Sequence, residues 1–211
     1  MKKIVAFGDS WTQGHGVEDD PNFKEVATPD SFIYHLRMCN SWVRWLADKF
    51  KLPFVNISQC GIDNTKILEY IKIYRQKLTA DDIVLIMWSY PYRHLNKEQT
   101  KHILLEDIIL EAEQHLQGLN YFFISSFVPT FKEEPDLLQR FDSSKWIDIE
   151  GCAADVLNEY ERINDISVWE YNSRKVYDEH SFSLGDYHPN LFGYQILGDY
   201  IYNKLHEKFN I

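Results

Sequence analysis

The chain has 211 residues, of which 45% are hydrophobic and 26% charged, and its formal net charge is −10. This length and composition allow one domain, residues 1–211, to bury a core without disulfides or metal ions, and they exclude a disordered or fibrous chain. The acidic charge and the lack of a dense run of Lys and Arg argue against nucleic acid as a partner.

The first fifty residues contain one strand pattern, one loop pattern and one helix pattern. Residues 2–7 are a short apolar run that ends in the turn Gly8-Asp9-Ser10, as expected of a buried strand. Residues 11–30 are polar and acidic without a period, which predicts a long loop. In residues 31–50 the apolar side chains recur at helical spacing, which predicts an amphipathic helix interrupted near Asn40.

Strand and helix patterns alternate through the middle of the chain. Apolar runs predict strands at residues 53–57, 83–88 and 121–124. Apolar residues at helical spacing predict helices at residues 64–78 and 97–116.

The last third of the chain has weaker patterns until its end. Residues 153–163 are expected to form a helix, and residues 167–171 a short strand. Pro189 and Asn190 then give a start signal for a closing helix that continues through Leu205. His188 is therefore expected just before a helix.

This alternation predicts an α/β fold with three layers, in which helices cover both faces of a central parallel sheet. In such sheets the ligand crevice lies outside the carboxyl ends of the strands. The topology should therefore bring three separated segments to one edge: Ser10, the turn at residues 58–61 and the turn at residues 88–93.

The beginning of the chain and its cysteines bear on location and cofactors. The apolar run at residues 4–7 is too short for a signal peptide core or a membrane span, so we expect no membrane partner. Cys39, Cys60 and Cys152 are an odd number without CxxC spacing, which fits isolated buried thiols in a reducing, cytoplasmic environment. Metalloprotease, dinucleotide and P-loop motifs are absent, so we expect no cofactor and no metal.

The Gly8-Asp9-Ser10 turn is the first candidate for chemistry. A serine hydroxyl becomes a good nucleophile only when a base takes its proton and donors hold the oxyanion that forms. At a strand-to-helix turn the hydroxyl of Ser10 would be presented at the sheet edge, and its own N–H could point at a carbonyl oxygen. The structural alternative is a turn in which Asp9 or Ser10 caps a backbone N–H.

Two other segments could complete such a site. Gly61 follows a predicted strand, so its N–H could be a second oxyanion donor, although it could also be an ordinary loop glycine. Asp186 lies two residues before His188, and a carboxylate there could orient the imidazole. A capping or surface histidine is the alternative for His188. His15, five residues after Ser10, could touch substrate from the loop, but a solvent-exposed loop histidine is the favoured expectation.

In order and spacing, the GDS block at residues 8–10, the glycine turn ending at Gly61 and the His188-Pro189 pair resemble the SGNH, or GDSL-like, hydrolase family. The resemblance implies that family's flavodoxin-like three-layer fold. It also implies a pair of Ser10 as nucleophile and His188 as base, with oxyanion contacts from the N–H groups of Ser10 and Gly61. Asp9 would shape the turn rather than act as the catalytic acid.

The chain departs from the family pattern at two places. The family's third block contains an asparagine that donates to the oxyanion, and its place here falls on Tyr90 or Pro91. A donor could come from Ser89, Tyr90 or Arg93, or be missing, and losing one donor costs about a hundredfold or more in rate. The family's aspartate three residues before the histidine is replaced by Gly185, which leaves Asp186 or a backbone carbonyl to orient His188.

These residues predict a serine esterase that acts on a small-molecule ester. The polar loop and the 15% aromatic content favour a small acyl group, such as acetyl on a carbohydrate, over a lipid chain. A thioesterase or an acyltransferase would use the same residues. A non-catalytic carbohydrate-binding or structural domain that keeps the scaffold is the alternative from another class.

Overall fold

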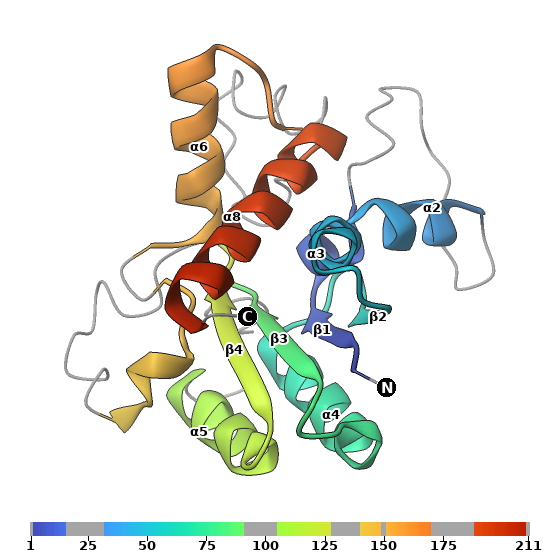
Figure 1. The fold of residues 1–211 in the computed structure, drawn as a ribbon, viewed down its shortest axis with the longest axis vertical. Helices are drawn as coiled ribbons and strands as arrows, with labels where there is room; N and C mark the ends of the chain where they lie inside the picture. Colours follow the sequence, from blue (N-terminus) through green and yellow to red (C-terminus); the bar gives the residue numbers. More distant parts are fainter. Residues whose placement is uncertain are drawn as a thin grey trace, which may run out of the picture.

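The chain is built around a four-stranded sheet (Figure 1). A computed structural model describes residues 2–15, 32–90, 105–127, 140–148, 151–169 and 188–209. The strands are β1 (Ile4–Gly8), β2 (Phe54–Ser58), β3 (Ile83–Trp88) and β4 (Asn120–Ser125). Their order is β2-β1-β3-β4, and every neighbouring pair is parallel.

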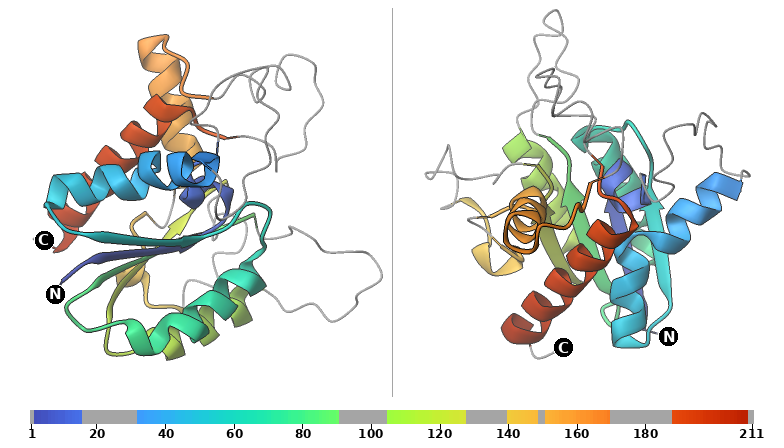
Figure 2. Two further views of the ribbon diagram at one scale, coloured as in Figure 1. Left: turned by 90° about the vertical axis from the view of Figure 1, so that its right-hand side faces the viewer. Right: turned by 90° about the horizontal axis from the view of Figure 1, so that it is seen from above.

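Helices cover both faces of this sheet (Figure 2). On one face lie α3 (Trp42–Phe50), α6 (Ala153–Asn164) and α8 (Leu191–Phe209). On the other face lie α4 (Asn64–Tyr74) and α5 (Leu105–Leu116). The other elements are α1 (Ser10–Gln13), α2 (Phe32–Asn40) and the 3-10 turns η1 (Arg75–Lys77) and η3 (Ser143–Lys145). The predicted three-layer α/β fold with a parallel sheet is confirmed.

Side chains of the central strands alternate between two apolar cores. From β1, Ile4 and Ala6 enter the core under α3 and α8, whereas Val5 and Phe7 enter the core under α4 and α5. All residues of β3 are at most 1% exposed. Both faces of this strand are covered, which is why its sequence is a continuous apolar run rather than an alternating one.

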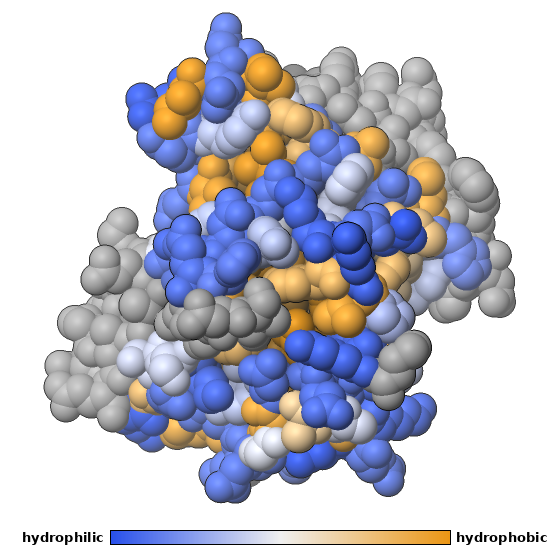
Figure 3. All heavy atoms as spheres, in the orientation of Figure 1, coloured by the Kyte–Doolittle hydropathy of each residue, from blue (hydrophilic) through white to orange (hydrophobic). Residues whose placement is uncertain are grey.

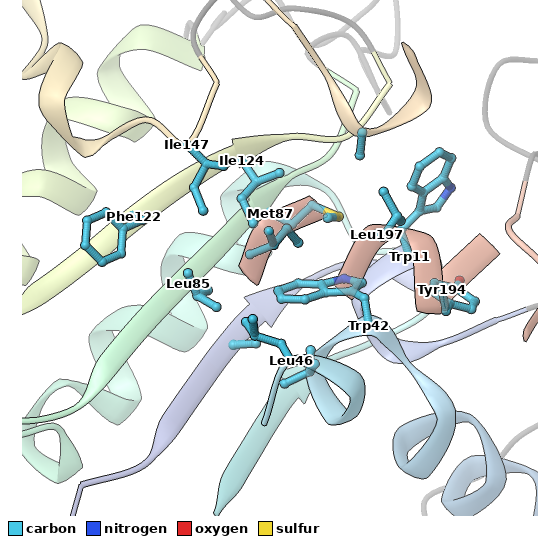
Figure 4. Close-up of a cluster of buried hydrophobic side chains, with 14 of the residues drawn as sticks. Trp11, Trp42, Leu46, Leu85, Met87, Phe122, Ile124, Ile147, Tyr194 and Leu197 are labelled. Carbon is cyan, nitrogen blue, oxygen red and sulfur yellow. The ribbon is translucent and has the colours of Figure 1, made fainter. Parts of the chain in front are cut away.

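The core under α3 and α8 contains large aromatic residues (Figure 4). Trp42 of α3 and Met87 of β3 lie close to Trp11 of α1, and all three are fully buried. The ring of Trp11 meets Phe127 edge-on at a centroid distance of 4.6 Å and Trp169 at 5.8 Å. Trp11 therefore anchors α1, including its first residue, Ser10, to the core.

The structure differs from the sequence expectations mainly at element ends. The helix expected at residues 31–50 is two helices divided at Ser41, close to the interruption at Asn40. The segment expected to be a loop from residue 11 begins with α1, and the rest of that segment, residues 16–30, lies outside the described residues. Within the strand expected at residues 167–171, the described residues 167–169 form one bridge, from Trp169 to Pro189, and residues 170–171 lie outside the described residues.

The three cysteines are not joined by disulfides. Cys152 is buried and Cys60 is half-buried, but Cys39 is exposed, which contradicts the expectation of three buried thiols. Hydrophilic residues cover much of the described surface seen in Figure 3, with smaller groups of hydrophobic residues among them. No helix within the described ranges combines the length and the apolar character that crossing a bilayer requires.

A buried carboxylate joins the starts of β1 and β3. Asp82 is fully buried and accepts hydrogen bonds from the backbone N–H of Lys3 and Thr79 and from Lys3 Nζ, which lies 2.8 Å from Oδ2. Burial alone would raise the pKa of Asp82, but the hydrogen bonds from Lys3 and Thr79 together with the Lys3 charge lower it below its usual value. Asp82 therefore favours the folded state when it is ionised.

We predict that Asp82→Asn lowers the free energy of unfolding by about 1–3 kcal/mol at neutral pH, because the donors lose a charged acceptor. Since the folded-state pKa is depressed, this contribution is present above the unfolded pKa and is lost as pH falls through the folded pKa. Urea denaturation at neutral and acid pH measures the difference. Asp81→Asn, at an exposed position, is the matched control, and equal losses in both variants would contradict the prediction.

Candidate active site

Ser10 lies where β1 ends and α1 begins, at the carboxyl edge of the sheet. Gly8 is the last residue of the strand, and Asp9 is the N-cap of α1. A Cβ on Gly8 would lie 2.0 Å from Oγ1 of Thr12. A side chain at this position would therefore collide with the first turn of the helix, which explains the glycine before the serine.

The buried carboxylate of Asp9 holds this turn in place. Its Oδ1 accepts the backbone N–H of Trp11 at 3.0 Å, and its Oδ2 accepts the hydroxyl of Ser89 at 2.6 Å. Ser89 follows the last residue of β3, so the contact links the ends of two neighbouring strands. Asp9 thus caps a backbone N–H, as the structural interpretation of this turn expected. The same contacts shape the turn that presents Ser10.

Asn64, which the sequence analysis did not single out, completes this link. Its Oδ1 accepts the N–H of Ser89 at 2.8 Å, and its Nδ2 donates to the carbonyl of Ser89 at 3.1 Å. Asn64 is the first residue of α4 and is 4% exposed. An asparagine at a helix start is common, so its sequence position gave no signal for this second contact.

His188 reaches Ser10 from the other end of the chain. Its Nε2 lies 2.9 Å from Oγ of Ser10, although 178 positions separate the two residues. Their exposed fractions are 7% and 1%, so the contact is buried. A hydroxyl and an imidazole at this distance form a pair in which the imidazole can take the hydroxyl proton.

The start of α8 fixes the position of His188. Asn190 donates from Nδ2 to the carbonyls of Ser167 and Trp169, and its backbone N–H donates to the carbonyl of Val168. Its Oδ1 accepts the N–H of Gly193, a contact typical of a helix N-cap. These bonds anchor Asn190, two residues after His188, to residues 167–169.

His15 lies beside this pair instead of in solvent. It is half-buried, and its ring stacks on that of His188 with a centroid distance of 4.0 Å and an interplanar angle of 24°. The expectation that His15 is solvent-exposed is therefore wrong, although it does lie outside a helix, in the turn that follows α1. The sequence analysis placed it in a loop, but α1 and its cap at Gly14 return it to the site.

The remaining site residues predicted from the sequence are the loop glycine after β2, the residues after β3 and the residues for which the structure gives no description. Gly61 follows β2 with a φ of 78°, in the left-handed region that favours glycine, and is exposed. The hydroxyl and N–H of Ser89 donate to Asp9 and Asn64, whereas Tyr90 packs half-buried against the core. Asp186 and Arg93 lie outside the described residues.

The part of the chain that the structure describes contains no group of three or more His, Cys, Asp or Glu side chains placed to hold a metal ion. The groups gathered at the sheet edge are a buried hydroxyl, an imidazole in contact with it and a second imidazole stacked on the first. A hydroxyl and an imidazole in contact can act as a nucleophile and a base. Acyl transfer needs in addition donors that hold the oxyanion.

Comparison with known proteins finds similarity in structure but not in sequence. No protein-family model matches the chain, and no curated protein matches it. Solved structures match over nearly the whole chain. A protein from Parabacteroides merdae, described as a candidate GDSL-like lipase, is 14% identical with a TM-score of 0.55, covering 97% of this chain and 96% of its own.

Two further matches are described as carbohydrate esterases. An acetyl xylan esterase from Geobacillus stearothermophilus is 13% identical with a TM-score of 0.54, covering 96% of this chain and 94% of its own. A family 2 carbohydrate esterase with a carbohydrate-binding domain, from Corynascus thermopiles, is 12% identical with a TM-score of 0.54, covering 100% of this chain and 67% of its own. At these identities the likeness shows a shared fold.

We predict that Asn64→Ala lowers the free energy of unfolding by about 2–4 kcal/mol, because it leaves both the N–H and the carbonyl of Ser89 without this buried partner. The midpoint of urea denaturation measures the change. Thr65→Ala, at the exposed neighbouring position of α4, is the control. If the two variants unfold at the same urea concentration, the link between α4 and β3 is not stabilising.

Proposed function

We propose that the protein is a serine esterase that hydrolyses a small acyl ester through an acyl-enzyme on Ser10. The observation that carries the proposal is the buried contact of 2.9 Å between Ser10 Oγ and His188 Nε2. The fold supports it, because structures with this fold include a GDSL-like lipase candidate and an acetyl xylan esterase. Membership of the SGNH family belongs to the same proposal and rests on the motifs at residues 8–10, Gly61 and His188.

The first half of the reaction uses Ser10 after β1, Gly61 after β2 and His188 before α8. His188 Nε2 takes the proton of Ser10, and Oγ bonds to the ester carbonyl carbon. The backbone N–H groups of Ser10 and Gly61 hold the negative oxygen that forms. His188 then gives its proton to the leaving alcohol as the ester bond breaks, which leaves the acyl group on Ser10.

The second half repeats these steps with water as the nucleophile. His188 takes a proton from water, the hydroxide attacks the acyl carbon, and the proton returns to Ser10 as the acid leaves. Asp186 is proposed to orient His188 during both halves. Because the donors of Ser89 are engaged with Asp9 and Asn64, a third oxyanion donor is assigned to Tyr90 or Arg93, or the site works with two.

The proposed substrate class is an acetyl ester of a carbohydrate. One enzyme among the structural neighbours, described in one structure as an acetyl xylan esterase and in another as an acetyl-xylooligosaccharide esterase, supports the acetyl group and the sugar. The buried position of Ser10, with 1% of its surface exposed, supports a small acyl group rather than a lipid chain. The protein is further proposed to act in the cytoplasm, without a cofactor and without nucleic acid or membrane partners, as its composition suggests.

We predict that the protein hydrolyses p-nitrophenyl acetate, and that Ser10→Ala and His188→Ala each lower kcat by about a thousandfold or more, because each removes half of the nucleophile–base pair. Initial rates of p-nitrophenolate release measure this. Ser143→Ala and His206→Ala, at exposed positions away from the site, are the matched controls and should keep the parent rate.

The outcomes separate the alternatives. Faster turnover of acetyl than of octanoyl esters supports the small acyl pocket, and the reverse order contradicts it. A higher kcat/KM for acetyl thioesters than for oxygen esters would indicate a thioesterase. A folded protein with no turnover, whose fluorescence changes on adding xylo-oligosaccharides, would indicate the non-catalytic carbohydrate-binding domain.

A further inference from the structure

We propose that His15 is a positioning residue that holds the imidazole of His188 in the orientation that reaches Ser10, and that Cys60 holds His15 in turn. This inference deepens the proposed function and rests on it. Its starting observation is the stack of the two imidazoles, with centroids 4.0 Å apart and planes inclined by 24°.

A contact with Ser10 at one nitrogen does not by itself fix the plane of the His188 ring. The outer torsion of a histidine side chain has a broad, roughly two-fold profile, so the ring can rotate about the bond that leads to it. A second flat ring stacked at 24° restricts this rotation. Displacing a catalytic group by about 1 Å can cost about a hundredfold in rate, so a restraint of this kind matters for the reaction.

His15 can act as a support because its own backbone is held on two sides. Its N–H donates to the carbonyl of Ser10 at 3.0 Å, which ties it to the residue it serves. Its carbonyl accepts the hydroxyl of Tyr194 at 2.7 Å, and Tyr194 lies fully buried on α8, six positions after His188. The backbone of His15 thus bridges the nucleophile and the helix that carries the base.

The ring of His15 is held from the other side by Cys60. Sγ of Cys60 lies 2.8 Å from Nδ1 of His15, and both residues are half-buried. Cys60 directly precedes Gly61, whose N–H is the second proposed oxyanion donor. The chain of contacts from Cys60 through His15 to His188 therefore connects the loop after β2 with the proposed base.

The groups of the described residues that face this stack come from three elements. Ser10 faces His188 from α1, and Cys60 faces His15 from the loop after β2. Tyr194 of α8 donates its hydroxyl to the backbone carbonyl of His15. The side-chain oxygens of Asp9 accept hydrogen bonds from Trp11 and Ser89.

The test compares three variants with the parent in steady-state hydrolysis of p-nitrophenyl acetate. His15→Ala, which removes the stacked ring, is expected to lower kcat about ten- to a hundredfold and to change KM less than about threefold. His15→Phe restores a flat ring and is expected to stay within about fivefold of the parent. Cys60→Ala leaves the ring but removes its partner, and a two- to tenfold lower kcat is expected.

Two controls show whether a lower rate comes from loss of the His15 ring and not from loss of any histidine or from unfolding. His35→Ala, at an exposed site on α2, should match the parent, and thermal unfolding shows whether each variant is folded. If His15→Ala does not fold, His15→Leu, which fills space without a flat ring, takes its place against His15→Phe. A parent without turnover counts against the proposed function. An active parent whose Ala or Leu variant matches it, or whose Phe variant is as slow as the Ala or Leu variant, overturns the positioning role.

Discussion

The buried carboxylate of Asp9 is the interaction on which the geometry of the site depends. It caps the short helix α1 and accepts the hydroxyl of Ser89, so it joins the carboxyl ends of β1 and β3 where the sheet order changes direction. This is the point at which open α/β sheets hold their ligands. A buried carboxyl group needs hydrogen-bond donors in place of water. The donors that Asp9 finds, on Trp11 and Ser89, fix the conformation of the turn that contains the next residue, Ser10.

The second requirement is that the last helix delivers a histidine to the same edge. The helix α8 packs along α3 over the core formed by Trp42, Leu46 and Leu197, and Asn190 fastens its first turn to residues 167–169. His188 is thereby placed within 2.9 Å of a hydroxyl that lies 178 positions earlier. Long-range packing, rather than any local motif, creates the contact between Ser10 and His188 on which the proposed esterase reaction rests.

Much of this arrangement could be predicted from the sequence, and the exceptions have physical reasons. The apolar run of β3 and the helical periods revealed the layers, because burial of both faces of a parallel sheet dictates those patterns. The GDS turn and the His188-Pro189 pair could be placed from their order along the chain. The contacts of Asn64 and His15 could not, because they depend on partners from distant segments, Ser89 after β3 and His188 before α8. The burial of His15 left no signal in the sequence, because α1 before it is only four residues long and gives no periodic pattern.

Covalent labelling tests the central claim, that Ser10 is a nucleophile activated by His188, most directly. The protein is incubated with a fluorophosphonate, digested and analysed by peptide mass spectrometry. The account predicts one phosphonyl group per chain on the peptide that contains Ser10, and loss of labelling in both Ser10→Ala and His188→Ala. Labelling that persists in folded Ser10→Ala, or that is absent from an active parent enzyme, would contradict it.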